Sequence, residues 1–189
     1  MSRGSAFFDD VAGGTDPAVL REAGDLAATI LVRGARESHD PAVTERIVHL
    51  AESEGLETLA EVWSGAPADT LAGSLWRLFL LRSWVYADPD RVAVEFDAGR
   101  RRVDVARVVA GVADPPGPDE LRAMVDDVLR GITRGDFAVT LFRASAFARI
   151  VAAGRASIGE SSHDEINRML ALSEQLEAAG HEEIRDTLG

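Results

Sequence analysis

The chain of 189 residues contains no cysteine and no lysine. Without cysteine it forms no disulfide, carries no thiol nucleophile and builds no cysteine-ligated zinc or iron–sulfur site. Without lysine it has neither a phosphate-binding loop of the G-x-x-x-x-G-K-[ST] type nor Schiff-base or lysine general-base chemistry. These two absences exclude several large enzyme classes before any motif is considered.

All 20 basic residues are therefore arginine. Their uniform use indicates a GC-rich genome, and the alternative is selection for the bidentate contacts that arginine makes. Because 32 residues are acidic, the net charge is −12, which opposes binding to nucleic acid and to anionic membranes. The basic cluster Arg100–Arg102 is more typical of a solvated loop than of a nucleic-acid site. We expect no nucleic-acid and no membrane partner.

Motifs of common enzymes are missing as well. The chain has no G-x-S-x-G and no dinucleotide-binding glycine fingerprint, and HEEIR at 181–185 lacks the second histidine of H-E-x-x-H. Glu45, His49 and Glu52 have a spacing that could serve a metal, but such spacing arises by chance in acidic helices and needs a further ligand. We assign no catalytic residue, no metal ligand and no cofactor, and the sequence favours a non-enzymatic protein.

Helix-start signals recur along the chain and predict an all-α fold. Asp-Pro pairs at 16–17, 40–41 and 88–89 place an N-cap before a proline in the first turn. Ser162 and Glu165 form the S-x-x-E pattern of a capping box. We expect Asp69 to cap the helix that follows it, and the chain after Gly180 to form a last turn or two of helix. Apolar residues recur at helical spacing, so we expect eight to ten helices with short connections, in a single-domain bundle or an array of antiparallel helical hairpins.

The segment 90–106 fits two patterns. Val92, Val94 and Phe96 occupy alternate positions, as do Val103 and Val105, and this is typical of a hairpin. However, the preceding Asp88-Pro89 pair is a helix start, Gly99 sits where a helix C-cap would, and an isolated hairpin is only marginally stable. We therefore expect two short helices here.

We expect one helical domain over residues 1–189. The proline-rich stretch at 113–118 is a candidate division between two lobes, and the N-terminal segment 1–14 is expected to be flexible. That segment lacks the apolar core of a signal peptide because Asp9 and Asp10 interrupt it. We expect the protein in the cytoplasm.

The most apolar run of the chain is DTLAGSLWRLFLLRSWVY at 69–86. The part from Thr70 to Tyr86 would form a helix of about 25 Å, shorter than a hydrocarbon core of roughly 30 Å. Its two arginines also oppose membrane insertion. Apolar side chains surround the predicted helix, so we place it at the centre of the bundle, buried on most sides and packed against a helix over 137–151.

The two arginines of this run are the candidate functional residues. Arg82 falls on the most apolar face of the helix, and Arg77 falls beside Trp84. A buried guanidinium needs a carboxylate or water, so Arg82 either pairs with an acidic residue or faces an anion-binding pocket floored by Trp76 and Trp84. Ion pairs are the more common arrangement. The candidate ligand-binding residues are Arg77, Arg82, Trp76 and Trp84.

Four segments, AATILVRGAR, LAGSLWRLFLLRSW, VAGVADPPGPDEL and RGDFAVTLFRASAF, give the chain a resemblance to small all-helical proteins of high-GC bacteria. The resemblance covers about 15–153, implies an all-helical fold and supplies no catalytic residue.

Two hypotheses for function follow from these observations. The first is a non-enzymatic helical interaction or regulatory module that binds a protein partner or self-associates. The alternative is a helical bundle, an enzyme in one version, that binds a small anionic ligand in a pocket around the 70–86 helix.

Overall fold

The computed structural model describes residues 17–34, 56–102, 117–134, 137–185 and 188, and no strand occurs in these ranges. The seven helices that it describes are α2 (Pro17–Arg33), α4 (Leu56–Trp63), α5 (Leu71–Ala87), α6 (Pro89–Arg100), α7 (Pro118–Arg134), α8 (Phe137–Ile158) and α9 (His163–Ile184). The all-α prediction is confirmed, but the described helices are fewer than the eight to ten expected. The helix predicted to begin at Pro41 lies outside the described residues.

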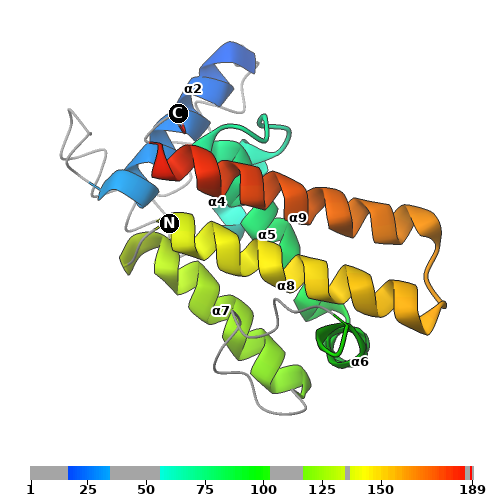
Figure 1. Ribbon diagram of the computed structural model, residues 1–189. Helices are drawn as coiled ribbons and strands as arrows, with labels where there is room; N and C mark the ends of the chain where they lie inside the picture. Colours follow the sequence, from blue (N-terminus) through cyan, green and yellow to red (C-terminus); the bar gives the residue numbers. More distant parts are fainter. Residues whose placement is uncertain (1–16, 35–55, 103–116, 135–136, 186–187, 189) are drawn as a thin grey trace, which may run out of the picture.

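The two longest helices, α8 and α9, lie side by side as an antiparallel hairpin (Figure 1). The chain reverses at Gly159, where φ is 77° and glycine is favoured. Ser162 and Glu165 then form the predicted capping box. Across the hairpin, the hydroxyls of Ser145 and Ser173 each donate to the backbone carbonyl of the other residue, at 2.8 and 3.0 Å. Small side chains allow this close contact.

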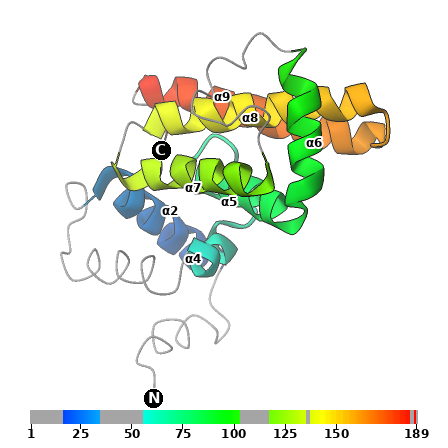
Figure 2. The ribbon, with the colours of Figure 1, turned by 90° about the horizontal axis from the view of Figure 1, so that it is seen from below.

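Helix α6 crosses α8 steeply near the turn of this hairpin (Figure 2). The crossing depends on two glycines. A Cβ atom on Gly154 would lie 1.7 Å from the carbonyl oxygen of Glu95, and one on Gly99 would lie 1.8 Å from that of Ile150. Gly99 therefore permits the helix crossing, and it lies one residue before the end of α6 at Arg100, close to the helix end expected from the sequence.

Helix α5 lies at the centre of the fold, as predicted, because it contacts each of the other six described helices. Leu75, Leu78 and Val85 are almost completely buried. The predicted packing against the 137–151 helix is only partly right, since α5 contacts α2, α4 and α7 more extensively than α8. The small residues of α8 instead bring α6 and α9 close to it.

The predicted helix starts are largely confirmed. The Asp88 carboxylate accepts from the backbone amide of Arg91 at 3.2 Å and caps α6. The segment 90–106 is therefore helical up to Arg100, as expected. The second helix expected there lies largely outside the described residues. Helix α5 corrects one detail, because Thr70, and not Asp69, is its N-cap.

The C-terminal region explains part of the lower helix count. Gly180 was expected to end one helix before a last short one, but α9 continues through it to Ile184. A Cβ atom on Gly180 would lie 2.9 Å from Cε1 of Phe142, so the glycine makes room for an aromatic ring of α8. Its role is packing and not helix termination.

Among the described helices, α8 alone is long and apolar enough to cross a membrane, and most of its apolar stretch is buried against the rest of the protein. The candidate lobe boundary at 113–118 lies mostly outside the described residues, as does all of 1–14. Helices on either side of that boundary pack together, since α6 contacts both α7 and α8.

Candidate functional site

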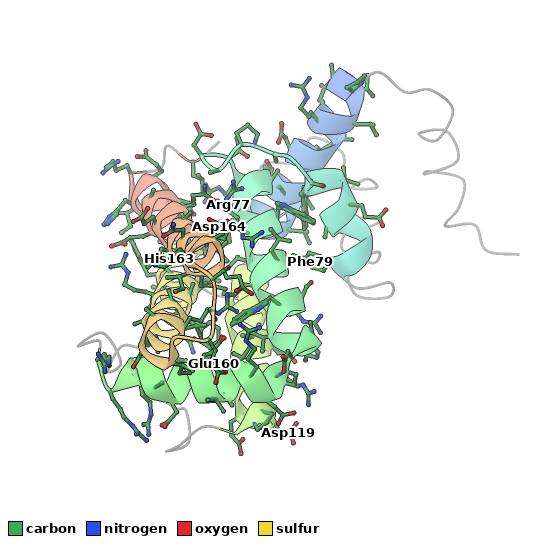
Figure 3. The ribbon with its side chains drawn as sticks, turned by 90° about the vertical axis from the view of Figure 1, so that its right-hand side faces the viewer. Arg77, Phe79, Asp119, Glu160, His163 and Asp164 are labelled. Atoms are coloured by element: carbon green, nitrogen blue, oxygen red, sulfur yellow. The ribbon has the colours of Figure 1, made fainter. Side chains whose placement is uncertain are left out.

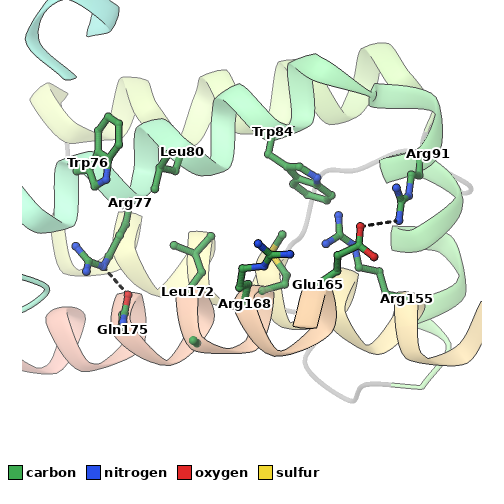
Figure 4. A pocket seen from close by; sticks show the side chains of 12 residues that line it. Trp76, Arg77, Leu80, Trp84, Arg91, Arg155, Glu165, Arg168, Leu172 and Gln175 are labelled. Carbon is green, nitrogen blue, oxygen red and sulfur yellow. Dashed lines mark hydrogen bonds and ion pairs between the residues drawn. The ribbon is translucent and has the colours of Figure 1, made fainter. Parts of the chain in front are cut away.

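A groove of about 510 Å³ lies between α5 and α9, and three of the four predicted ligand contacts line it: Trp76, Arg77 and Trp84. Arg91 of α6 and Arg155 of α8 lie at one end (Figure 4). We call this site the α5–α9 groove. Its lining combines apolar with cationic side chains: Trp76, Arg77, Leu80, Trp84, Arg91, Arg155, Glu165, Arg168, Met169, Ala171, Leu172 and Gln175.

The α5 wall of the groove follows from helical spacing. Trp76, Leu80 and Trp84 are four residues apart and therefore share one face. This side of α5 is open, since Leu80 is 40% exposed and both tryptophans are only partly buried. The expectation that α5 is buried on most sides therefore does not hold for this stripe.

The α9 wall has polar ends and an apolar middle. Glu165, Arg168, Leu172 and Gln175 are three, four and three residues apart, so they also share one face. Figure 4 shows this stripe opposite α5, with Leu172 facing the wall that carries Leu80. Two amphipathic faces thus meet without closing the space between them.

Arg77 marks one end of the α5–α9 groove. Its Nε donates to Oε1 of Gln175 at 2.6 Å, and its Nη1 donates to the carbonyls of Gly73 and Ala66 at 2.8 and 3.5 Å. Figure 3 shows Arg77 on the α9 side of α5. Burial lowers the pKa of Arg77, and the charge of Asp69 opposes this shift. The guanidinium remains charged, and no ion pair with a carboxylate forms in the described part of the chain.

The other end is built on a buried carboxylate, Glu95. Its Oε2 accepts from Nε of Arg155 at 2.9 Å, and its Oε1 accepts from Nε of Arg91 at 2.8 Å. The side chains of Glu95 and Arg155 are only 4% and 6% exposed. The hydrogen bond to Glu95 raises the pKa of Arg91, and the Arg155 guanidinium also stacks 4.4 Å from the ring of Trp84. One carboxylate therefore holds two arginines in place.

Glu165 is the carboxylate that faces the groove directly. One oxygen accepts from the backbone amide of Ser162 at 2.8 Å, and this bond lowers the pKa of Glu165. The other oxygen lies 3.7 Å from Nη2 of Arg91, which also donates to Ser161 at 2.9 Å. Through these contacts with Ser162 and Arg91, Glu165 connects the start of α9 with the start of α6.

Arg168 differs from Arg91 and Arg155. Its only hydrogen bond within the described ranges runs from Nε to the carbonyl of Asp164, one turn earlier on its own helix, at 3.2 Å. No carboxylate of the described residues pairs with it. Arg77 and Arg168 are therefore two groove arginines whose charge has no ion-pair partner in the described structure.

Arg82 does not line the α5–α9 groove. Its Nε lies 3.0 Å from Oδ1 of Asp126 on α7, and its guanidinium stacks 4.2 Å from the ring of Tyr86. The Tyr86 hydroxyl donates to the other oxygen of Asp126 at 2.5 Å. The sequence left two alternatives for Arg82, an acidic partner within the protein or an anion-binding pocket. The structure contains the first, an ion pair that joins α5 to α7.

The sequence analysis does not identify Arg91, Arg155 and Arg168 of the groove lining, nor the buried Glu95 that holds the first two. The signal for Arg168 was present, since it belongs to the amphipathic α9 stripe. Arg91 and Glu95 are spaced i, i+4 on α6, a spacing that is typical of an ordinary helix-surface pair. Nothing local connects Glu95 with Arg155, which lies 60 residues later.

No group of three or more His, Asp or Glu side chains within the described residues could hold a metal ion. The candidate set Glu45, His49 and Glu52 lies outside those residues. Comparisons with protein-family models, curated proteins and solved structures found no match to this chain.

Proposed function

We propose that this protein is a non-enzymatic binding module, and that the α5–α9 groove binds a small anionic ligand with an apolar body. The observation that carries the proposal is the pair of groove arginines, Arg77 and Arg168, without an ion-pair partner among the described residues. In a chain of net charge −12, a cationic groove is unexpected on charge alone.

The shape and chemistry of the groove support a small ligand. Its volume of about 510 Å³ lies within the range of small-molecule sites, roughly 300–1,000 Å³. Trp76, Leu80, Trp84 and Leu172 offer an apolar surface, and arginine is the side chain best suited to carboxylate or phosphate. An aliphatic or aromatic carboxylate satisfies both kinds of contact.

Isothermal titration with dodecanoate, below its micelle concentration, tests this proposal. We expect saturable one-to-one binding that weakens with salt, and no such binding of dodecyltrimethylammonium, which has the same chain and the opposite charge. Arg168→Gln should weaken dodecanoate binding at least about tenfold, because a hydrogen bond to a charged group contributes roughly 1.5–3 kcal/mol.

Arg21→Gln on α2 is the matched control. Arg21 also donates through Nε to the carbonyl four residues earlier, at 3.3 Å, and has no ion pair within the described structure. It differs from Arg168 in lying outside the groove. Equal effects of both substitutions, or equal binding of the anionic and cationic amphiphiles, would overturn the proposed function.

The protein-partner hypothesis remains a separate prediction. Large exposed apolar side chains such as Val19, Val94, Val139 and Ile184 lie on four different helices and mark no comparable site in the described structure. Light scattering combined with affinity purification would test self-association or a protein partner, and a strict monomer with no reproducible partner would contradict it.

A further inference from the structure

The described charges at the α5–α9 groove indicate how many anionic groups its ligand carries. Four guanidinium groups, those of Arg77, Arg91, Arg155 and Arg168, line it. Glu95 and Glu165 supply two carboxylates, and both are engaged with Arg91 or Arg155. The described groove therefore keeps two positive charges without a paired carboxylate, one at Arg77 and one at Arg168.

These two charges lie at opposite ends of an apolar middle section. Leu80 and Leu172 lie between Arg77 and Arg168 (Figure 4). On this basis, which rests on the proposed function, we propose that the ligand is a dianion, with one carboxylate or phosphate-like group at each end of an apolar body. Long-chain α,ω-dicarboxylates are the simplest members of this class.

Helix geometry gives the spacing that such a ligand needs. Arg77 bonds to Gln175, which is seven residues from Arg168 on α9, and Arg168 leans back toward Asp164. At about 1.5 Å per residue, seven to eleven residues place the two guanidinium groups roughly 10–17 Å apart. An extended chain advances about 1.25 Å per C–C bond, so about nine to fourteen carbons span this distance.

The end of the groove at Arg91 and Arg155, which we call its closed end, also supports binding of the second anionic group at Arg168. Arg91 and Arg155 already share Glu95, which is buried, and Glu165 lies beside Arg91. A ligand carboxylate at this end would meet its strongest unshared donor in Arg168. Glu165 would repel a third negative charge, so the arrangement favours two anionic groups over a more highly charged ligand.

Titration of matched pairs of acids tests the inference. We expect dodecanedioate to bind at least about tenfold more tightly than dodecanoate, and hexanedioate, which is too short to reach both arginines, to lose that advantage. In a purely apolar groove the order would be reversed, because the second carboxylate makes the chain more polar.

Arg168→Gln should remove the advantage of the diacid, so that both twelve-carbon acids bind with similar affinity, whereas Arg21→Gln should preserve it. Arg168 is the better site for this test because its described hydrogen bond stays within its own helix. Equal or tighter binding of dodecanoate by the unmodified protein would overturn the dianion inference and leave the proposed function intact. Failure of both acids to bind would overturn the proposed function itself.

Discussion

Two sides of helix α5 carry an arginine each, and the two arginines have different surroundings. Arg82 faces α7 and meets a carboxylate, Asp126, at 3.0 Å. Arg77, five residues earlier and about 140° around the helix, faces α9 and meets a neutral amide, Gln175, at 2.6 Å. An arginine forms an ion pair where the facing helix presents an acid, as Arg82 does. Where the facing helix presents an amide, as for Arg77, no carboxylate of the described residues pairs with it.

Helix α9 is not short of acidic residues, so their placement decides the contrast. Glu177 pairs with Arg149 of α8, and Glu183 pairs with Arg33 of α2. These carboxylates lie on faces directed away from the α5–α9 groove. Only Glu165 of this helix lines it, at the end occupied by Arg91. A chain of strong negative charge can thus present a locally cationic groove.

The largest expected effect comes from Glu95→Gln, which removes the buried charge that compensates the closed end of the groove. Breaking a buried ion pair leaves an uncompensated guanidinium, so we expect a loss of about 3–5 kcal/mol in the free energy of unfolding, measured by urea denaturation. Asp97→Asn is the control on the same helix, since its pairs with Arg100 and Arg101 are more exposed, and it should cost no more than about 1 kcal/mol. Similar losses for both would contradict this view of Glu95.

A smaller effect is expected from Arg77→Gln. The substitution removes the donors to Gly73, Ala66 and Gln175, so urea denaturation should show a loss of about 1–2 kcal/mol. Arg168→Gln should change stability by less than about 0.5 kcal/mol, because its described contacts are confined to one exposed turn. Equal losses in the two variants would remove the distinction between an anchored and an unanchored groove arginine.

Asp126→Asn tests the side of α5 that faces α7. It should lower the free energy of unfolding by about 1 kcal/mol or less, because the Arg82–Asp126 pair is partly exposed. It also has a specific signal, since Tyr86 is the only tyrosine in the chain. The hydrogen bond to Asp126 raises the pKa of Tyr86, so in the unmodified protein this bond contributes stability below a pH of about 10 and loses it as the pH rises through the folded pKa.

In Asp126→Asn the pKa of Tyr86 should fall toward its ordinary value, measured by the near-ultraviolet absorbance of the tyrosinate. An unchanged titration would show that Asp126 does not control Tyr86.

The smallest effect is expected at Glu165. Its folded pKa is lowered, so its contribution to stability is present above the ordinary pKa of about 4.3 and is lost as the pH falls through the lower folded value. Glu165→Gln keeps a capping-box side chain but cannot titrate. The difference in unfolding temperature between the two proteins should therefore diminish below about pH 4, and a difference that is constant with pH would contradict this role.

Much of the fold could be predicted from local sequence. Helix capping depends on residues within one turn, so it can be predicted from local sequence. The structure contains the helix starts predicted at Asp88-Pro89 and at Ser162–Glu165. Gly180 shows the opposite case, because it resembles a helix end in the sequence but lies inside α9, where its lack of a Cβ makes room for Phe142 of α8. Gly99 does lie next to the end of α6, but its contact with Ile150 of α8 could not be predicted locally.

The candidate site was predictable in part. Trp76, Arg77 and Trp84 all line the α5–α9 groove, and their spacing along one helix places them near one another. Helical spacing places Arg82 on a different face from Arg77, but it does not say which neighbour each face meets. Those neighbours are α7 and α9, whose contacts with α5 follow from the packing of the whole bundle.

The sequence by itself determined the helical class, the apolar stripe of α5, the amphipathic stripe of α9 and the excess of negative charge, because each depends on composition or on spacing within one helix. Only the tertiary structure decided that Glu95 joins Arg91 to Arg155 and that Asp126 pairs with Arg82. It also decided that Arg77 and Arg168 face one groove in which no described acid pairs with them. Contacts of this kind depend on how packed helices cross and rotate, and the Gly99–Gly154 crossing of α6 over α8 sets that geometry at the groove's closed end.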